Sequence, residues 1–142
     1  MNHDSYSDAY LRDVLSGEGA IAVLGLSNNP ARASHQVFLD LLRRGYRAFG
    51  VNPGIAGQLI GGAPVYAQLT DAPAPLAIVD VFRNSDAAGA SVDEALALPV
   101  PPRAIWLQLG VRHNEAAARA ESRGVKMVMD RCIKIEIARL SL

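Results

Sequence analysis

The sequence predicts an α/β fold: a Rossmann-like open, mostly parallel sheet of five strands with helices on both faces, in a single domain. Short apolar runs alternate along the chain with segments of helical periodicity. The runs are continuous rather than alternating, which is typical of parallel strands that are buried on both faces. The length of 142 residues fits one domain, since domains cluster at about 100–150 residues.

The first part of the chain predicts one helix and then a strand–helix–strand unit. Residues 6–15 place tyrosine, valine and leucine side chains at helical spacing, with Ser5 or Ser7 as the cap. This helix belongs to an N-terminal extension, residues 1–19, ahead of a Rossmann-like domain at residues 20–142. The unit that opens the domain consists of a strand at 20–26, a helix at 35–44 and a strand at 46–51.

The second part of the chain continues the alternation after a glycine-rich interruption. Residues 54–63 contain four glycines and predict a loop, and residues 64–66 predict a short extended piece. Asn114 is the expected cap of the second helix that follows. The remaining elements are a strand at 76–82, a helix at 85–98, a strand at 103–109, a helix at 114–123, a strand at 125–129 and a helix at 133–140.

Composition narrows the classes of function. The 14 basic and 14 acidic residues give a formal net charge of zero, whereas nucleic-acid binders usually carry a basic excess. The single cysteine excludes an intrachain disulfide and a multi-cysteine zinc site. No apolar run approaches the roughly 20 residues of a membrane-spanning helix, and the first residues do not resemble a signal peptide. We therefore expect a cytoplasmic protein without a membrane partner, for which a homodimer is permitted but not required.

A ligand is expected beyond the carboxyl ends of the strands, where open parallel sheets bind their ligands. The first turn there is GLSNNPARAS at residues 25–34, and it leads into a helix whose N-terminus favours an anion. Ser27 and Ser34 add hydroxyl groups, and Arg32 adds a planar fork that suits a phosphate. The same residues also fit an ordinary strand-to-helix loop with Ser34 as a plain cap, and position alone leaves both open.

Several absences bear on the ligand and on catalysis. The turn has Gly25 but lacks the other glycines of the dinucleotide-binding fingerprint, and the second strand ends in Val51-Asn52-Pro53 without an acidic residue for a ribose. Both features disfavour NAD. The sequence lacks the Gly-Lys-Ser/Thr of a P-loop, which disfavours ATP hydrolysis. No nucleophile–base pair, metal cluster or carboxylate pair is visible, which favours a binding module over an enzyme.

Five segments occur in an order that resembles a known family: GLSNNPARAS, GYRAFGVNP, IVDVFR, AIWLQLGV and VMDRCIKIE. They resemble the small stand-alone CoA-binding domain family, which is similar to the CoA-binding Rossmann domain of the succinyl-CoA synthetase alpha subunit. The resemblance runs from about residue 20 to residue 140 and implies coenzyme A as the ligand. The residues implied to bind it are Gly25, Ser27, Pro30, Arg32, Ser34, Asn52, Pro53, Val81, Phe82, Arg83, Ser85, Trp106, Gln108, Gly110, Arg131 and Cys132.

The resemblance also implies a role for each group of residues. The first loop would surround the CoA phosphates, the end of the second strand would lie near the nucleotide, and the end of the third near the adenine or the pantetheine arm. Three positions have other interpretations. Trp106 also fits as a core residue, Arg83 as a surface partner of Asp80 or Asp86, and Arg131 as the partner of Asp130 in an ion pair.

Cys132 is the one candidate reactive group. If the last helix begins at Cys132 or Ile133, the helix dipole would stabilise the thiolate, and the thiol could form a mixed disulfide with CoA. A buried, inert cysteine fits the sequence equally well. The functions left open are a non-catalytic carrier or regulatory module, a subunit of a CoA ligase-like enzyme, a small nicotinamide-dependent reductase, and a domain that has lost its ligand.

Overall fold

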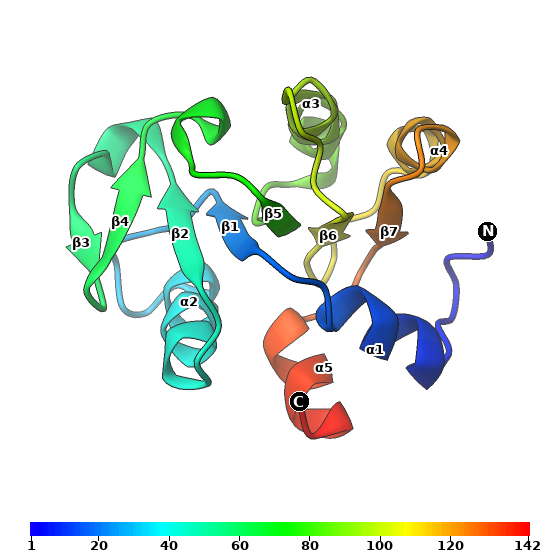
Figure 1. The fold of residues 1–142 in the computed structure, drawn as a ribbon, viewed down its shortest axis with the longest axis horizontal. Helices are drawn as coiled ribbons and strands as arrows, with labels where there is room; N and C mark the ends of the chain where they lie inside the picture. Colours follow the sequence, from blue (N-terminus) through cyan, green and yellow to red (C-terminus); the bar gives the residue numbers. More distant parts are fainter.

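Seven strands form one sheet, in the order β3-β4-β2-β1-β5-β6-β7, in the computed structural model, which describes residues 1–142 (Figure 1). The predicted α/β, Rossmann-like class is confirmed, and the five predicted strands pair in parallel throughout. The strand order reverses at β1, which has β2 on one side and β5 on the other. The five strands are β1 (Ala20–Leu24), β2 (Ala48–Val51), β5 (Leu76–Val81), β6 (Ala104–Leu107) and β7 (Lys126–Val128).

Two short strands extend the sheet beyond the predicted five. β4 (Ala63–Tyr66) pairs in parallel with β2, where the sequence predicted a short extended piece. β3 (Leu59–Ile60) pairs antiparallel with β4, so the expected loop at residues 54–63 is in part a hairpin. Gly61 and Gly62 form its two-residue turn with φ angles of +58° and +83°. Two consecutive positive φ angles are what a type I′ hairpin turn requires, so these glycines mark a turn between strands.

Helices cover both faces of the sheet. Figure 1 shows α3 (Ser85–Leu96) and α4 (Asn114–Ser122) above the sheet, with α1 (Asp8–Leu15), α2 (Ala33–Arg43) and α5 (Ile133–Leu140) below it. Two apolar cores result, one on each face. All residues of β1, β2, β5 and β6 are buried, as the continuous apolar runs predicted. None of the helices combines the length and apolar character that crossing a membrane requires.

The sequence predicted the N-terminal caps of two helices, α1 and α4. Ser7 caps α1, since its side chain accepts a hydrogen bond from the Tyr10 amide. The expected Asn114 cap of α4 is wrong, because the cap is His113, whose Nδ1 accepts from the Ala116 amide at 3.0 Å. Asn114 is already in the first turn, and its Oδ1 accepts from Arg112 Nε instead.

The N-terminal segment lies along the outer edge of β7, which pairs with no further strand. Tyr10 Oη donates to the Met127 carbonyl at 2.7 Å and accepts from the Met127 amide at 3.2 Å. Tyr6 Oη accepts from the Met129 amide at 2.8 Å. Two tyrosine hydroxyls thus satisfy backbone groups that a neighbouring strand would otherwise pair.

Candidate functional site

The candidate site begins at the carboxyl end of β1, beside the end of β5. Gly25 turns the chain there with φ +90°, and a Cβ at this position would lie only 2.6 Å from the Phe82 carbonyl oxygen. A glycine is therefore required for the two strand ends to approach this closely. The Gly25 amide donates to the Val51 carbonyl at 2.9 Å, which ties the turn to β2 as well.

Internal hydrogen bonds hold the first loop in shape. Ser34 Oγ accepts from the Ser27 amide at 3.0 Å, and the Ser27 carbonyl lies 2.9 Å from His35 Nδ1. Ser34 therefore closes the loop, and the plain-cap interpretation is wrong. Helix α2 begins at Ala33 after Arg32, and no side chain caps it. The uncapped helix N-terminus presents donors and the positive end of the dipole to an anion.

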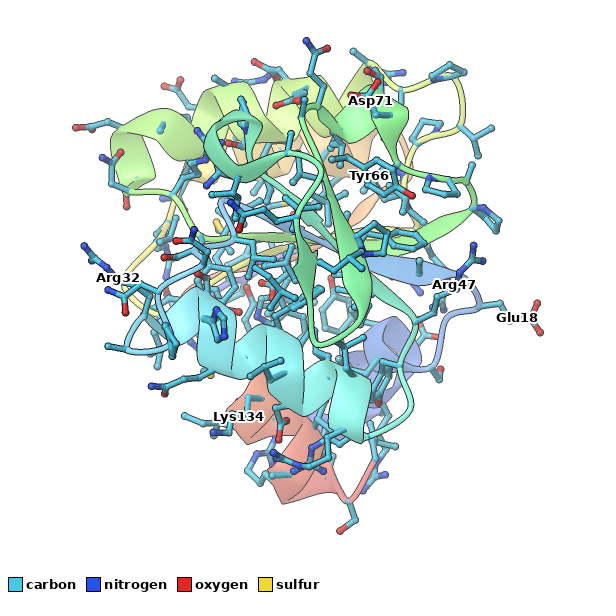
Figure 2. The ribbon with its side chains drawn as sticks, turned by 90° about the vertical axis from the view of Figure 1, so that its left-hand side faces the viewer. Glu18, Arg32, Arg47, Tyr66, Asp71 and Lys134 are labelled. Carbon is cyan, nitrogen blue, oxygen red and sulfur yellow. The ribbon has the colours of Figure 1, made fainter.

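A cavity of about 380 Å³ lies above this loop. Six residues line it: Gly25, Ser27, Arg32, Ala33, Ser34 and Phe82. In Figure 2, Arg32 lies at the left margin by the start of α2, on the opposite side of the molecule from Glu18 and Arg47, which flank the amino ends of β1 and β2. The cavity is thus at the carboxyl edge, where the topology predicted the ligand.

Two arginines without acidic partners border this cavity. The ion pairs of the arginines involve neither Arg32 nor Arg83. Arg83 Nε lies 3.4 Å from the point where a Gly25 Cβ would stand, so its guanidinium reaches over the turn. The surface pair with Asp80 or Asp86 considered from the sequence does not form. Both side chains are exposed and available to a negatively charged ligand.

Asn52 and Pro53 lie beside the loop at the end of β2. Asn52 Nδ2 donates to the Leu26 carbonyl at 2.9 Å, and its Oδ1 accepts from the Gly54 amide at 2.9 Å. Asn52 therefore holds the first loop against β2 through its Nδ2 and caps the turn that follows β2 through its Oδ1. Pro53 is exposed and starts a single 3-10 turn, Pro53–Ile55. Pro30 is also exposed, at the tip of the first loop.

The loops at the carboxyl edge of the sheet form a rim. Its far half consists of the loops after β5, β6 and β7, which are linked to one another. Ser85 Oγ donates to the Gly110 carbonyl at 3.4 Å and accepts from the Arg112 amide at 3.1 Å. The Gly110 amide in turn donates to Asp130 Oδ1 at 2.7 Å. Gln108 Oε1 accepts from the Ile133 amide at 3.4 Å, at the start of α5. These side chains shape the rim by holding one loop against the next.

Trp106 and Val81 are buried completely, on opposite faces of the sheet. Trp106 Nε1 donates to the Arg131 carbonyl at 2.9 Å, so the indole supports the β7–α5 loop from below. Its place in the core agrees with the second interpretation of this residue from the sequence. Neither side chain reaches the surface of the cavity.

Arg131 points away from the cavity, toward the N-terminal segment. Its guanidinium lies 5.0 Å from the centre of the Tyr6 ring and donates to the carbonyl groups of Asp130 and Asp4. The Asp130–Arg131 ion pair does not form, because the Asp130 carboxylate accepts from Gly110 instead. Cys132 follows as the cap residue of α5, with a free, partly buried thiol.

Asp80 is a feature that the sequence analysis did not single out as a site residue. Its carboxyl group is completely buried, and neither oxygen has a hydrogen-bond partner. It stands in β5 between Val23 and Trp106 of the neighbouring strands, two residues before Phe82. Burial raises the pKa of Asp80 well above its usual value. A lone acid inside the apolar run LAIVDVF was the available signal.

The chain is similar to known proteins over most of its length. Residues 19–138 match the model of a family described as CoA binding domain. The uncharacterized protein YneT of Bacillus subtilis is 34% identical over 129 residues, which cover 91% of this chain and 93% of YneT. Both matches extend through nearly the whole chain, including every strand of the sheet.

Solved structures also match this chain over nearly its whole length. The structure of cell-free ID.343 from Thermus thermophilus has a TM-score of 0.87 and 39% identity, covering 95% of this chain and 99% of that one. A hypothetical protein from Pyrococcus horikoshii OT3 has a TM-score of 0.86 and 28% identity, covering 98% and 95%. The predicted resemblance is therefore confirmed, and this chain belongs to the CoA-binding domain family.

Proposed function

We propose that this protein binds coenzyme A, free or acylated, at the carboxyl ends of β1 and β5, as a non-catalytic carrier or regulatory module. The observation that carries the proposal is the cavity at the uncapped start of α2, bordered by two arginines that lack acidic partners. Membership of the CoA-binding domain family supports the same ligand.

The residues present suit the chemistry of this ligand. The diphosphate of CoA is an anion, which a helix N-terminus and arginine guanidinium groups bind through charge-assisted hydrogen bonds. Arg32 and Arg83 would supply those guanidinium groups, and Ser27 would add a hydroxyl. The Phe82 ring offers an apolar surface for the adenine or the pantetheine arm, since aromatic side chains stack well on flat heterocycles.

Calorimetric titration with CoA tests the proposal directly. We expect CoA to bind and Arg32→Ala to weaken it by about tenfold, as the loss of a charge-assisted hydrogen bond does. Arg123→Ala is the matched control, because Arg123 is also exposed and unpaired but follows α4. Because the Arg32 side chain makes no capping hydrogen bond, Arg32→Ala should leave the melting temperature of the ligand-free protein unchanged. Binding of NAD without binding of CoA would overturn the proposal.

We further propose that Cys132 forms a mixed disulfide with CoA by exchange with oxidised CoA. The Cys132 thiolate would attack one sulfur of the CoA disulfide, which forms the protein–CoA disulfide and releases the other CoA as a thiolate. The support is the position of this free thiol at the cap of α5, on the carboxyl edge. Mass spectrometry after treatment with oxidised CoA should show one CoA added to the wild type and none to Cys132→Ser. An unmodified wild type would refute the exchange.

A further inference from the structure

Helix α5 begins with two backbone amides that no protein group uses. Cys132 is its cap residue, and the Cys132 side chain makes no capping hydrogen bond. The Glu136 amide donates to the Cys132 carbonyl at 3.0 Å, whereas the amides of Lys134 and Ile135 have no partner in the protein. The amides of the second and third helical residues are those that a cap side chain normally meets. An acceptor oxygen beside the Cys132 sulfur would therefore find two donors at this helix start.

Gln108 supplies a second, independent feature at the same place. It is 6% exposed, and its Oε1 accepts from the Ile133 amide at 3.4 Å, which holds the carboxamide group at the start of α5. The Nε2 of Gln108 makes no hydrogen bond in the protein and retains access to the surface. A largely buried amide that leaves its donor unused is unfavourable. This donor therefore indicates a ligand acceptor, such as a carbonyl oxygen, next to Cys132.

The start of α5 lies within reach of a ligand that is held at the first cavity. Phe82, which lines that cavity, and Cys132 pack against the same apolar core, on the face that α2 and α5 cover together (Figure 1). Gln108 is the neighbour of Phe82, since the residues just before them pair in the register of β5 and β6. Adjacent strands are about 4.8 Å apart, so the crossing from β1 past β5 to β6 is about 10 Å. An extended pantetheine arm is longer than this crossing.

We propose that the start of α5 is an acyl-transfer site, at which Cys132 takes an acyl group from acyl-CoA. The Cys132 thiolate attacks the carbonyl carbon of the thioester, and a carbon–sulfur bond to the protein forms. The carbonyl oxygen gains negative charge, which the two free α5 amides and Gln108 Nε2 stabilise as donors. The carbon–sulfur bond to CoA then breaks, and CoA leaves as a thiolate. One thiolate replaces another, so the step needs no oxidant and no further reactant.

The inference rests on the proposed function, because the acyl donor is the acylated form of the proposed ligand. It gives the carrier role a chemical form, in which the acyl group is carried as a thioester of Cys132. One thioester is exchanged for another of similar free energy, so an excess of CoA should remove the acyl group again.

Mass spectrometry of the full chain after treatment with acetyl-CoA tests the transfer. We expect one acetyl group on the wild type, which hydroxylamine releases because it cleaves thioesters, and none on Cys132→Ser. Gln108→Glu keeps an oxygen for the Ile133 amide but loses the Nε2 donor. Alkylation of Cys132 by iodoacetamide is the reference reaction, because it uses the same thiolate but forms no oxyanion. The ratio of acetylation rate to alkylation rate should fall about 100-fold in Gln108→Glu.

Gln68→Glu is the matched control, because it makes the same substitution at an exposed residue that follows β4. It should keep the wild-type ratio of the two rates. Two results would overturn the transfer site while leaving the proposed function intact. One is acetyl-CoA that binds the wild type in calorimetry and leaves Cys132 unmodified. The other is a ratio in Gln108→Glu equal to that of the wild type.

Failure of the proposed function gives a different result, in which acetyl-CoA neither binds nor reacts. The acetyl thioester of N-acetylcysteamine, which lacks the nucleotide, then decides the transfer site. Acetylation of Cys132 by this small thioester, slowed in Gln108→Glu relative to alkylation, would support the site. An unmodified Cys132 would overturn it.

Discussion

Asp80 has an unusual environment for an acidic residue. It is fully buried between two strands, and no donor reaches its carboxyl oxygens. An ionised carboxylate in such surroundings is strongly destabilised, so burial raises the pKa of Asp80 well above the usual value and favours the neutral acid. The folded protein therefore keeps this proton at pH values where the unfolded chain has already released it.

This difference in proton binding makes stability depend on pH. Because the pKa of Asp80 is higher in the folded state, its contribution is complete below the unfolded pKa of about 3.9 and is lost as pH rises toward the folded value. Asp80→Asn does not titrate. As pH rises through this window, the wild type should lose stability relative to Asp80→Asn. We expect the difference between their free energies of unfolding to change by about 1.4 kcal/mol per pH unit in favour of the variant.

Denaturant unfolding between pH 5 and pH 8 measures the effect. Asp86→Asn is the control, since Asp86 is an exposed carboxylate a few residues away. If the profiles of Asp80→Asn and wild type run parallel, Asp80 is ionised in the folded protein or its proton is shared with a group that the structure does not place beside it.

Part of the candidate site could be predicted from individual residues of the sequence. Gly25, Ser27, Arg32 and Ser34 were predicted together, and the cavity gathers all four, because they belong to one loop. Their part in binding stays a prediction. The direction of Arg131 was not predictable, since it depends on Tyr6, which is 125 positions away in sequence. The isolation of Asp80 was missed for the same reason: its partners, or their absence, come from other strands.

At the scale of elements, the strands that were predicted are those with continuous apolar runs. β3 was not predicted because it has only two residues, one of which is exposed, and so shows no hydrophobic pattern. The packing of the N-terminal segment against β7 was not predicted either. The periodicity of residues 6–15 indicates an apolar face of a helix but does not indicate which element packs against it. The tyrosines on that face supply both apolar area and hydroxyl groups to an otherwise open sheet edge.

Tyr10→Phe tests this edge contact. Burial raises the pKa of Tyr10 to about 12, so the hydroxyl keeps its proton at neutral pH and can both donate and accept. Its removal leaves the Met127 amide and carbonyl without a protein partner, which we expect to lower the free energy of unfolding by about 1–3 kcal/mol. Hydrogen exchange at the Met127 amide should accelerate in the variant.

Tyr46→Phe provides the comparison, because Tyr46 is half-buried and its hydroxyl makes no hydrogen bond. This second variant should keep both its stability and its exchange rates. Unchanged protection of Met127 in Tyr10→Phe would mean that the tyrosine hydroxyl is not what closes the edge.

At the scale of the whole molecule, zero net charge conceals an uneven distribution. Arg43, Arg44, Arg103, Arg119 and Arg139 pair with carboxylates away from the cavity. Arg32 and Arg83 are left unpaired at the carboxyl edge, where Arg112 pairs with Asp4 and Arg131 pairs with no carboxylate. The overall charge therefore provides no attraction for a polyanion such as nucleic acid, whereas a small anion meets local positive charge at one edge of the sheet.

Ligand binding at that edge should stabilise the whole fold, because the loops that form it come from β1, β5, β6 and β7 and exist together only in the folded protein. A ligand at one hundred times its Kd stabilises the native state by about 2.7 kcal/mol. For a chain of 142 residues this corresponds to a rise in Tm of about 8 °C. The fluorescence of Trp106, the single tryptophan and fully buried, reports unfolding. We expect this rise with CoA, a smaller one for Arg32→Ala at the same CoA concentration, and little change with NAD. An equal rise with NAD would point to general stabilisation by nucleotides, and the preference for CoA would then have to be abandoned.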